Sequence, residues 1–271
     1  MMDKYKRLLE ILRPMEKVLV AFSGGADSSF LLFAAVEALG KGNVTAATAV
    51  SPAKPAREAA SAEKLAGALG VDHIIFEVDE LSLDEVAGNR KDRCYHCKKH
   101  IFSRLKEKAG KKKAVHVLEA SNTDDEAAYR PGEKAVREMG IKSPLKEAGL
   151  SKRDIVELSG ACGLETGGIP PESCYLTRFP YDTEITPGKI KKVEDIENVV
   201  RSFGPVQVRA RVYGERVRIE VPRKDIGKLI RKEAYNTIEG VCAAHGFENV
   251  TIDPEGYRSG RMDEEHGQKK T

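Results

Sequence analysis

The segment Val18–Ser29 combines residue types that together favour an anion-binding turn. An apolar run predicts a buried strand, and it is followed by the turn Ser23-Gly24-Gly25-Ala26-Asp27-Ser28-Ser29 and then by an apolar helical pattern. Backbone N–H groups at the start of a helix attract an anion, and the helix dipole strengthens this attraction. The two glycines let the backbone approach an oxyanion, and the three serines add hydroxyl donors. We therefore predict a phosphate site, with an ordinary glycine turn as the alternative.

A second group of reactive residues consists of three cysteines. Cys94 and Cys97 lie three residues apart at the start of a predicted helix, so both thiols can face one metal ion or cluster. A zinc half-site, a redox pair and two unrelated buried thiols fit the same spacing. Cys174 lies in a separate loop, and with the pair it could bind three irons of a cubane cluster and leave the fourth iron open. The spacing alone does not decide among these possibilities.

Composition limits the class of protein. Charged residues make up 32% of the 271 residues, yet the net charge is only +3. A protein that binds a long stretch of nucleic acid usually has a much larger excess of basic residues. The pattern of Met1–Leu12 predicts an amphipathic helix too charged for a secretory signal, and no later apolar run could span a bilayer. We therefore expect a cytoplasmic protein without a disulfide framework. Cys162 and Cys242 fit the pattern of buried structural thiols.

The alternation of apolar runs and helical patterns predicts an α/β fold with a parallel sheet covered by helices on both faces. The expected strands are Lys17–Phe22, Val44–Val50, His73–Val78 and Ala114–Ala120, and the expected helices are Ser28–Leu39, Ala56–Leu69, His96–Lys108 and Ser151–Ala161. Ligands of such sheets bind beyond the carboxyl ends of the strands. The turn at Ser23, Ser51 after the second strand and Ser121 after the fourth all lie there, so we predict that they bind a nucleotide cofactor.

The pattern changes near Thr183, where an αββαβ order begins. Its elements are a helix over Gly188–Ser202, strands over Val206–Val212 and Arg216–Val221, a helix over Lys224–Ala244 and a strand over Asn249–Ile252. We predict a large domain over residues 1–184 and a small α+β domain over 185–271, with a mostly antiparallel sheet. The segment from Arg258 to Thr271 is polar and is expected to be a loose tail.

The turn at Ser23 resembles the PP-loop of the ATP pyrophosphatases, also called adenine nucleotide alpha-hydrolase-like proteins. It lacks the Gly-Lys-Ser/Thr ending of the usual P-loop, so no lysine within the turn reaches a terminal phosphate. The resemblance implies that ATP is bound through its β and γ phosphates and reacts at its α phosphate.

A closer resemblance covers nearly the whole chain. Together with the PP-loop, the motifs resemble those of the LarE family of ATP-dependent sulfur transferases, which help to build the nickel-pincer nucleotide cofactor of lactate racemase. These motifs are Arg93-Cys94-Tyr95-His96-Cys97-Lys98, Ser121-Asn122-Thr123-Asp124-Asp125, Tyr129-Arg130-Pro131-Gly132, Ser143-Pro144-Leu145, Cys174 to Tyr181, Arg209-Ala210-Arg211, Arg218-Ile219-Glu220 and Gly256 to Met262.

The LarE resemblance implies a reaction in two steps. A carboxylate of pyridinium-3,5-biscarboxylate mononucleotide is adenylated by ATP, and sulfur then replaces AMP to give a thiocarboxylate. One branch of the family sacrifices the sulfur of a single cysteine, at the position of Cys174. Another branch holds a 4Fe-4S cluster on three cysteines and delivers an extra sulfide from it. Because this chain has Cys94, Cys97 and Cys174, it resembles the cluster branch, and we expect ATP, Mg²⁺ and a 4Fe-4S cluster as cofactors.

Charged residues suit further roles in this reaction. Asp27 is the carboxylate nearest to the phosphate site and is expected to hold Mg²⁺ or the loop. Asp124 and Asp125 could face the metal or order their own loop, and a solvated helix cap is the alternative. A substrate with a phosphate and two carboxylates needs cations, and the guanidinium groups of Arg178, Arg209 and Arg211 suit it. We assign Arg178 and Cys174 to catalysis beside Asp27, and Arg178, Arg209, Arg211 and Glu220 to substrate binding. A solvated strand face, with the arginines paired to Glu220, remains the alternative.

Other functions share parts of this pattern. A tRNA thiolation enzyme would use similar cysteines but needs a basic surface or an RNA-binding module, and an amide-forming ligase would leave the three cysteines unexplained. A scaffold with a vestigial nucleotide site would release no pyrophosphate. We expect a small-molecule nucleotide substrate and a sulfide or persulfide donor as partners, with no membrane and no nucleic acid. The LarE resemblance also implies a homo-oligomer.

Overall fold

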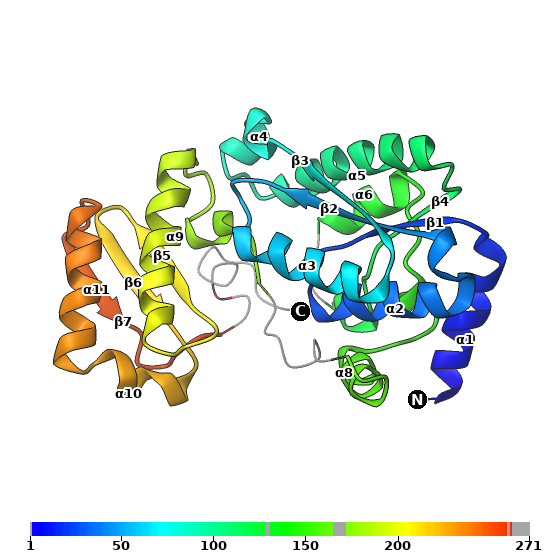
Figure 1. Cartoon of the computed structure of the whole chain (residues 1–271). Coiled ribbons are helices and arrows are strands. Elements are labelled where there is room, and N and C mark those ends of the chain that lie inside the picture. The colour runs from blue at the N-terminus through cyan, green and yellow to red at the C-terminus, as the bar shows by residue number, and fades with distance from the viewer. Residues whose placement is uncertain (1, 128–130, 165–171, 259–260, 262–271) are drawn as a thin grey trace. The chain divides into compact units, whose positions relative to one another are not determined.

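The computed structural model describes residues 2–127, 131–164, 172–258 and 261, and these residues form two compact units (Figure 1). The first unit consists of residues 1–51, 56–83 and 92–171. Its elements are α1 (Met2–Leu12), β1 (Val18–Ala21), α2 (Ala26–Leu39), β2 (Val44–Val50), α3 (Ala56–Leu69), β3 (Asp72–Glu77), α5 (Arg93–Lys112), β4 (His116–Leu118), α6 (Gly132–Glu138), α7 (Pro144–Glu147) and α8 (Lys152–Ala161).

The sheet of the first unit has the strand order β3-β2-β1-β4, and all its strand pairs are parallel. Val18 pairs with Val44 on one side and with His116 on the other, so β1 is a central strand. Parallel strands end at the same edge of their sheet. The residues that follow β1, β2 and β4 therefore share the carboxyl edge, and the α/β fold class predicted from the sequence is confirmed.

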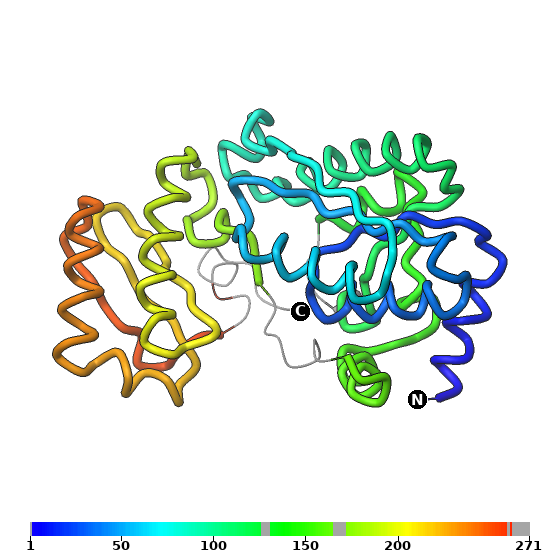
Figure 2. Tube along the Cα trace, in the orientation of Figure 1, coloured from blue at the N-terminus to red at the C-terminus, as the bar shows by residue number. Residues whose placement is uncertain are grey.

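Helices cover both faces of this sheet, and alternate residues of β1 enter different cores. Val18 and Val20 pack into a core with residues of α1, α2, α3 and α8, whereas Leu19 packs into a second core with Phe102 and Leu105 of α5. The chain path in Figure 2 shows α2 and α3 on one side of the sheet and α5 and α6 on the other. Because both faces of the sheet are buried, the strands consist mainly of apolar residues, and polar residues that could bind a ligand lie at the strand ends.

The second unit consists of residues 52–55, 84–91 and 172–271. Its elements are α4 (Asp84–Ala87), α9 (Pro187–Ser202), β5 (Arg209–Tyr213), β6 (Arg216–Glu220), α10 (Ile226–Leu229), α11 (Lys232–Ala244) and β7 (Asn249–Ile252). The sheet has the order β5-β6-β7, with β5 antiparallel and β7 parallel to β6. The predicted smaller α+β domain is therefore present, but its sheet is mixed rather than mostly antiparallel.

Most elements agree with the sequence prediction, and the differences have local causes. The strand predicted over Val206–Val212 begins only at Arg209, and Val206 is exposed. The helix predicted over Lys224–Ala244 is divided into α10 and α11, because Arg231 is extended, with φ −64° and ψ 137°. The short helices α4, α6 and α7 were not predicted, since four to seven residues contain too little hydrophobic periodicity to be recognised.

The sequence prediction drew the domain boundary at residues 184/185. In the structure, residues 172–184 pack within the second unit, where Arg178 pairs with Glu197 of α9. The Tyr129-Arg130 pair and most of the C-terminal tail lie outside the described residues. Within the described part of the chain, no helix is both long and apolar enough to cross a membrane.

The start of α8 is fixed by a capping box. Ser151 accepts a hydrogen bond from the backbone N–H of Asp154, whose side chain in turn accepts one from the Ser151 N–H. Asp154 also pairs with Lys4 of α1 at 2.6 Å. The hydrogen bond from Lys4 and those from Ser151 hold the pKa of the Asp154 carboxyl well below its usual range.

Replacing Ser151 with alanine should lower the free energy of unfolding by about 1 kcal/mol, since the first turn of α8 loses its side-chain acceptor. Urea denaturation followed by circular dichroism measures this change. Ser103→Ala, at an exposed position inside α5, is the control and should not destabilise the protein. Equal stability of Ser151→Ala and wild type would show that the cap is unimportant.

Candidate functional site

Hydrogen bonds within the predicted anion-binding turn hold its conformation. The hydroxyls of Ser23 and Ser28 lie 3.1 Å apart, and the Ser28 hydroxyl donates to the Gly25 carbonyl at 3.1 Å. The backbone N–H of Gly25 donates to the Ser23 hydroxyl at 3.3 Å. Helix α2 begins at Ala26, so its first N–H groups have no partner within the helix and are available to an anion.

Gly24 is the position where this turn requires a glycine. Its φ of +75° lies in the left-handed region, and a Cβ there would meet the backbone nitrogen of Ala62 at 2.9 Å. The base of the turn is fixed by Thr48, which donates to the Phe22 carbonyl at 2.7 Å and contacts His73 at 2.8 Å. Burial lowers the pKa of His73. The turn is therefore rigid before any ligand binds.

The other predicted nucleotide-binding serines differ in their surroundings. The Ser29 hydroxyl is buried without a hydrogen-bond partner among the described residues, and the same holds for the hydroxyl of Ser51 after β2. Ser121, after β4, donates through its hydroxyl to Glu119 at 2.7 Å. Glu119 also accepts a hydrogen bond from Ser143. Ser121 is thus fixed by a buried carboxylate at the edge of the sheet.

A cavity of about 460 Å³ opens beside Ser121. Its lining residues carry both signs of charge. Lys98 and Arg137 are positive, and Glu119 and Glu133 are negative. Lys146 pairs with Glu133 at 2.6 Å, and this hydrogen bond lowers the pKa of the Glu133 carboxyl. A polar cavity at the carboxyl edge of a parallel sheet is where ligands of such folds bind.

The carboxylates near the turn have different partners. Asp27 forms an ion pair with Lys152 at 2.6 Å. Asp124 accepts a hydrogen bond from the backbone N–H of Lys152 at 2.9 Å, and Asp125 accepts one from the backbone N–H of Asn122 at 3.1 Å. Asp124 therefore links its loop to the start of α8, whereas Asp125 orders its own loop and also lines the cavity beside Ser121.

The predicted ligand cysteines lie on two elements. Cys94 and Cys97 are in the first turns of α5 and share one face of the helix, since residues three apart are neighbours there. Cys94 is exposed, and Cys97 and Cys174 are half-buried, so all three thiols can be reached. Within residues 2–127, 131–164, 172–258 and 261, no group of three or more His, Cys, Asp or Glu side chains is arranged to hold a metal ion.

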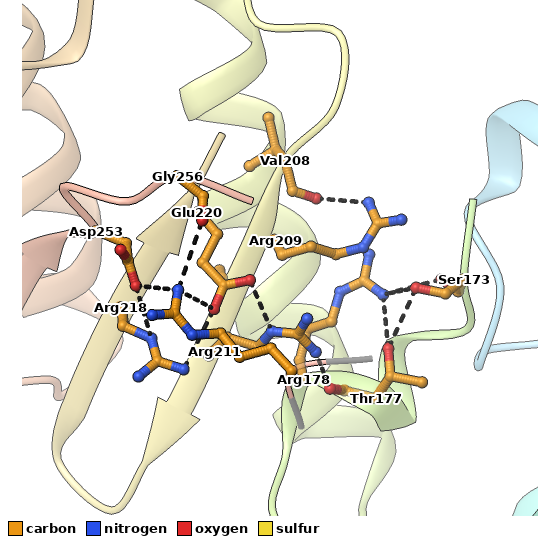
Figure 3. Close-up of polar contacts among 12 residues, drawn as sticks. Ser173, Thr177, Arg178, Val208, Arg209, Arg211, Arg218, Glu220, Asp253 and Gly256 are labelled. Atoms are coloured by element: carbon orange, nitrogen blue, oxygen red, sulfur yellow. Dashed lines mark hydrogen bonds and ion pairs between the residues drawn. The ribbon is translucent and has the colours of Figure 1, made fainter. Parts of the chain in front are cut away.

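Cys174 precedes a short 3-10 helix whose conformation depends on Arg178. One terminal nitrogen of Arg178 donates to the Ser173 hydroxyl at 2.7 Å and the Thr177 hydroxyl at 2.9 Å (Figure 3). The same nitrogen donates to the Cys174 carbonyl at 3.0 Å. The rest of the guanidinium group donates to both oxygens of Glu197, at 2.7 and 3.2 Å. Arg178 is fully buried, so in this arrangement it holds the cysteine turn in place.

Glu197 is the centre of this arrangement. Besides Arg178, it accepts hydrogen bonds from Arg201 at 2.7 Å and from the backbone N–H of Ala210 at 3.1 Å. Ala210 lies on the edge strand β5, so the carboxylate satisfies an N–H that no neighbouring strand can reach. Burial alone would raise the pKa of Glu197, but the charge of Arg178 and its hydrogen bonds outweigh burial and lower it. Glu197 therefore stays ionised in a dry environment.

The small sheet presents an arginine-rich face. Arg209 is paired with Glu220 and Arg211 with Arg218 across β5 and β6, so these four side chains share one face. Arg211 donates to Glu220 at 3.2 Å and to the Thr177 carbonyl at 2.5 Å. Arg218 contacts Glu220 at 3.2 Å (Figure 3). The predicted substrate-binding residues are thus brought together, and Glu220 orients Arg211 and Arg218.

Asp253 and Arg261 complete this face. Arg261 pairs with Asp253 and lies 3.7 Å from Glu220. We use the name arginine cluster for Arg178, Arg209, Arg211, Arg218 and Arg261, which surround the buried carboxylates Glu197, Glu220 and Asp253. Arg201 also pairs with Glu197, while Glu172 lies 4.0 Å from Arg201 and Glu255 pairs with Arg261 at 3.1 Å, so the excess of positive charge around the buried carboxylates is small.

Arg209 shows the effect of this excess. It is only 2% exposed, and its guanidinium group donates to the Val208 carbonyl at 2.9 Å and lies over the Tyr257 ring. Burial and the nearby charge of Arg178 lower its pKa. A nearby negative charge offsets the repulsion from Arg178, as Glu197 already does, so a bound anion would act on Arg209 in the same direction.

The two remaining cysteines differ in burial. Cys242 is buried on α11, and burial raises the pKa of its thiol to about 12. Cys162 follows α8 and is half-buried, and burial raises the pKa of its thiol as well. Cys242 thus has the surroundings of a structural thiol, and neither cysteine is activated as a nucleophile.

Sequence reasoning missed two residues. Lys152 acts on Asp27, 125 positions away, so no local spacing could reveal it, and the arginine that pairs with Glu197 could not be identified from spacing either. For Glu197 a signal did exist, since a glutamate on the apolar side of a helical pattern, next to Ile196, requires a buried cation as its partner.

Glu197→Gln should lower the free energy of unfolding by about 3–5 kcal/mol, because it leaves Arg178 buried without its counter-charge. Urea denaturation at neutral pH measures this loss. Asp195→Asn on the same helix removes a more exposed pair with Lys191 and should cost less than about 1 kcal/mol. Because the pKa of Glu197 is lowered, its contribution is complete above the ordinary glutamate pKa of about 4.3 and is lost at lower pH. Equal effects of the two substitutions would contradict this account.

Known proteins resemble part or most of this chain. The NAD synthase family matches residues 8–114, which include the anion-binding turn. A pyridinium-3,5-bisthiocarboxylic acid mononucleotide synthase from Lactiplantibacillus plantarum is 36% identical over 262 residues, which cover 96% of this chain and 94% of that protein. An uncharacterized protein from Synechocystis sp. is 33% identical over 260 residues, which cover 96% of this chain and 97% of that protein. An uncharacterized protein from Methanocaldococcus jannaschii is 29% identical over 245 residues, which cover 90% of this chain and 92% of that protein. The chain therefore belongs to the LarE family of PP-loop, ATP-dependent sulfur transferases.

Proposed function

We propose that this protein converts a carboxylate of pyridinium-3,5-biscarboxylate mononucleotide to a thiocarboxylate, as a step in the biosynthesis of the nickel-pincer nucleotide cofactor. The observation that carries the proposal is the similarity, over 96% of the chain, to a synthase named for the bisthiocarboxylic acid mononucleotide. The arginine cluster supports it, because a mononucleotide with a phosphate and two carboxylates needs several guanidinium groups.

The proposed reaction is a substitution in two steps without any oxidation or reduction. A carboxylate oxygen of the substrate attacks the α phosphate of ATP, a P–O bond forms, and pyrophosphate leaves. A hydrosulfide then attacks the carbonyl carbon of the acyl adenylate, the C–S bond forms, and the C–O bond to AMP breaks. The rigid turn Ser23–Ser29 would bind the phosphates, with Ser51 and Ser121 contributing to the nucleotide site.

The residues present fit Mg²⁺ in the first step. Mg²⁺ is usually bound by one or two carboxylates together with substrate phosphates and water. Asp27, with its partly exposed carboxylate next to the anion-binding turn, can supply that ligand. When bound, Mg²⁺ would neutralise charge on the phosphates. Asp124 accepts a hydrogen bond from the backbone N–H of Lys152 at the start of α8, and Asp125 accepts one within its own loop, so we propose structural roles for both.

In the small unit, the structure favours different roles for the arginines. Arg209 and Arg211 are candidates for binding the phosphate or carboxylates of the substrate, with Glu220 orienting Arg211. Arg178 uses its donors on Glu197 and on the turn of Cys174. We therefore propose that Arg178 contributes to catalysis by positioning Cys174 and not by binding the substrate.

We further propose that Cys94, Cys97 and Cys174 hold a 4Fe-4S cluster, which would carry the transferred sulfide on an iron without a protein ligand. The donor set fits such a cluster, since thiolates are its usual ligands and three of them leave one iron open. The adjacent positions of Cys94 and Cys97 on α5 support the proposal. A sulfide donor would supply the sulfur directly, whereas a persulfide donor would need a two-electron reductant, such as a thiol pair, to release it as sulfide. The protein would act as a homo-oligomer without nucleic acid or membrane.

The reaction is tested by anaerobic incubation of the protein with ATP, Mg²⁺, sulfide and the biscarboxylate mononucleotide. Pyrophosphate, AMP and thiocarboxylate should form in equal amounts, as measured by liquid chromatography and mass spectrometry. Cys174→Ser should release at most one pyrophosphate per site and form no thiocarboxylate, since adenylation precedes sulfur transfer. Cys162→Ser is the matched control and should keep full activity. Pyrophosphate release that does not depend on the mononucleotide would contradict the proposed substrate.

The cluster is tested by iron and sulfide analysis after anaerobic reconstitution. Wild type and Cys162→Ala should bind about four irons per chain and show the absorption of a 4Fe-4S cluster. The double variant Cys94→Ala/Cys97→Ala should lose the cluster and sulfur transfer but keep the thermal stability of cluster-free wild type, because Cys94 is exposed and Cys97 half-buried. Full sulfur transfer by the double variant would rule out the cluster mechanism.

A further inference from the structure

The cavity beside Ser121 has a buried carboxylate in its lining. Glu119 directly follows β4 and is only 7% exposed. It accepts hydrogen bonds from the backbone N–H and the hydroxyl of Ser121, at 3.2 and 2.7 Å, and from the hydroxyl of Ser143. These donors are all neutral, so they fix the carboxylate in place without balancing its negative charge.

The charges of the lining favour a ligand with a cationic centre. Lys146 is engaged by Glu133 at 2.6 Å, so it does not need to neutralise another carboxylate. Among the described residues, the acidic groups of the lining outnumber the basic ones, and Glu119 is the most buried of them. These groups are Glu119, Asp125, Glu133 and Glu147 against Lys98, Arg137 and Lys146. A positive group on the ligand would balance the carboxylate of Glu119.

The apolar part of the lining indicates what kind of cation fits. Val136 and Ile141 line the same cavity, and each is only 6% exposed. A compact ion such as Mg²⁺ would need several oxygen ligands. Within the described residues, however, no three acidic, histidine or cysteine side chains are arranged to hold a metal ion. A flat aromatic cation needs no such ligands and can pack its faces against apolar side chains, so it suits this lining better.

The position of the cavity suits the group that reacts with ATP. Strands β1 and β4 are neighbours, and Val20 pairs with Leu118 near their carboxyl ends. The anion-binding turn follows β1 and Glu119 follows β4, so both leave the same edge of the sheet from adjacent strands. A carboxylate that attacks the α phosphate must lie beside the turn that holds the phosphates. The volume of about 460 Å³ is also in the usual range for a small-molecule site.

We propose that this cavity binds the pyridinium ring of the mononucleotide and that Glu119 recognises the positive charge of the ring. The ring packs against Val136 and Ile141, and Lys98 and Arg137 suit its two carboxylates. Glu119 is then a specificity-determining residue, which selects a cationic ring over an uncharged ring of similar shape. The inference rests on the proposed function, but it concerns recognition of the ring and includes no bond-making step.

Two probes that differ in the charge of the ring test this proposal by isothermal titration. One is the biscarboxylate mononucleotide, and the other is its 1,4-dihydropyridine form, which keeps the phosphate, ribose and carboxylates but has an uncharged ring. The titrations contain α,β-methylene ATP, so that no adenylate forms. Wild type should bind the pyridinium form roughly 10- to 100-fold more tightly, because it is attracted to a carboxylate in a partly dry site. Glu119→Gln, with a side chain of the same size, should bind the two probes about equally.

Equal binding of the two probes by wild type would overturn the proposal without the need for any variant. A ratio of affinities in Glu119→Gln that matches wild type would overturn it as well. The ratio is the informative quantity, since a general disturbance of the cavity weakens both probes alike.

Two control variants separate recognition by Glu119 from other effects. Ser143→Ala removes one hydrogen-bond donor of Glu119 but keeps its charge, and Glu147→Gln removes a charge from an exposed position of the same lining. Both should keep most of the wild-type ratio. If Glu119 only ties Ser121 to Ser143, the ratio should survive in Glu119→Gln, which contradicts the proposal. Loss of the ratio in Glu147→Gln to the same extent would also contradict it, because the preference would then come from the general field of the cavity.

Failure of this inference can be distinguished from failure of the proposed function. If the mononucleotide is not the substrate, wild type should form no thiocarboxylate and bind neither probe, and both are then wrong. If only the inference is wrong, wild type should still form the thiocarboxylate, while the ratio of affinities does not depend on Glu119.

Discussion

The buried carboxylate of Glu197 is the interaction on which the small unit depends. A carboxylate that is buried away from water needs several hydrogen-bond donors to stay charged. Glu197 accepts hydrogen bonds from Arg178, Arg201 and the backbone N–H of Ala210 in β5. Each donor comes from a different part of the chain. Arg178 in turn holds the carbonyl of Cys174. The turn that carries Cys174, a proposed cluster ligand, is therefore held by a buried ion pair.

In the large unit, the candidate ligand-binding residues are positioned by the parallel sheet and not by a buried ion pair. Its parallel sheet is buried on both faces, so polar residues gather at the carboxyl edge, where the chain leaves each strand. The turn after β1 is rigid because Gly24 accepts a left-handed conformation against α3 and because Thr48 anchors its base. Rigidity matters here, since a preorganised site loses little entropy when a phosphate binds.

The parts of the structure that depend on local pattern could be predicted from the sequence. Strand β2 and helix α3 match their predicted bounds, and α1 forms over Met2–Leu12, where the amphipathic pattern predicts a helix. The family could also be recognised, because its motifs are short and keep their order along the chain. The division between α10 and α11 was missed, since the extended Arg231 has no special residue type.

Contacts between distant residues could not be predicted in the same way. The sequence shows that Asp27 lies in the turn and that Lys152 begins a helix, but only the folded chain brings them together. Likewise, the spacing of Arg209 and Arg211 predicts a shared face, whereas the burial of Arg178 against Glu197 depends on how residues 172–178 pack against α9. Such pairs determine which candidate residues are free to meet a substrate.

The central claim, that sulfur reaches the substrate without consuming the protein, can be tested by measuring the intact mass of the chain after turnover. The cluster-loaded enzyme is incubated anaerobically with excess sulfide, ATP and mononucleotide, and protein and product are analysed by mass spectrometry. The account predicts several thiocarboxylates per chain and an unmodified Cys174. A single thiocarboxylate per chain, with conversion of Cys174 to dehydroalanine, would contradict it.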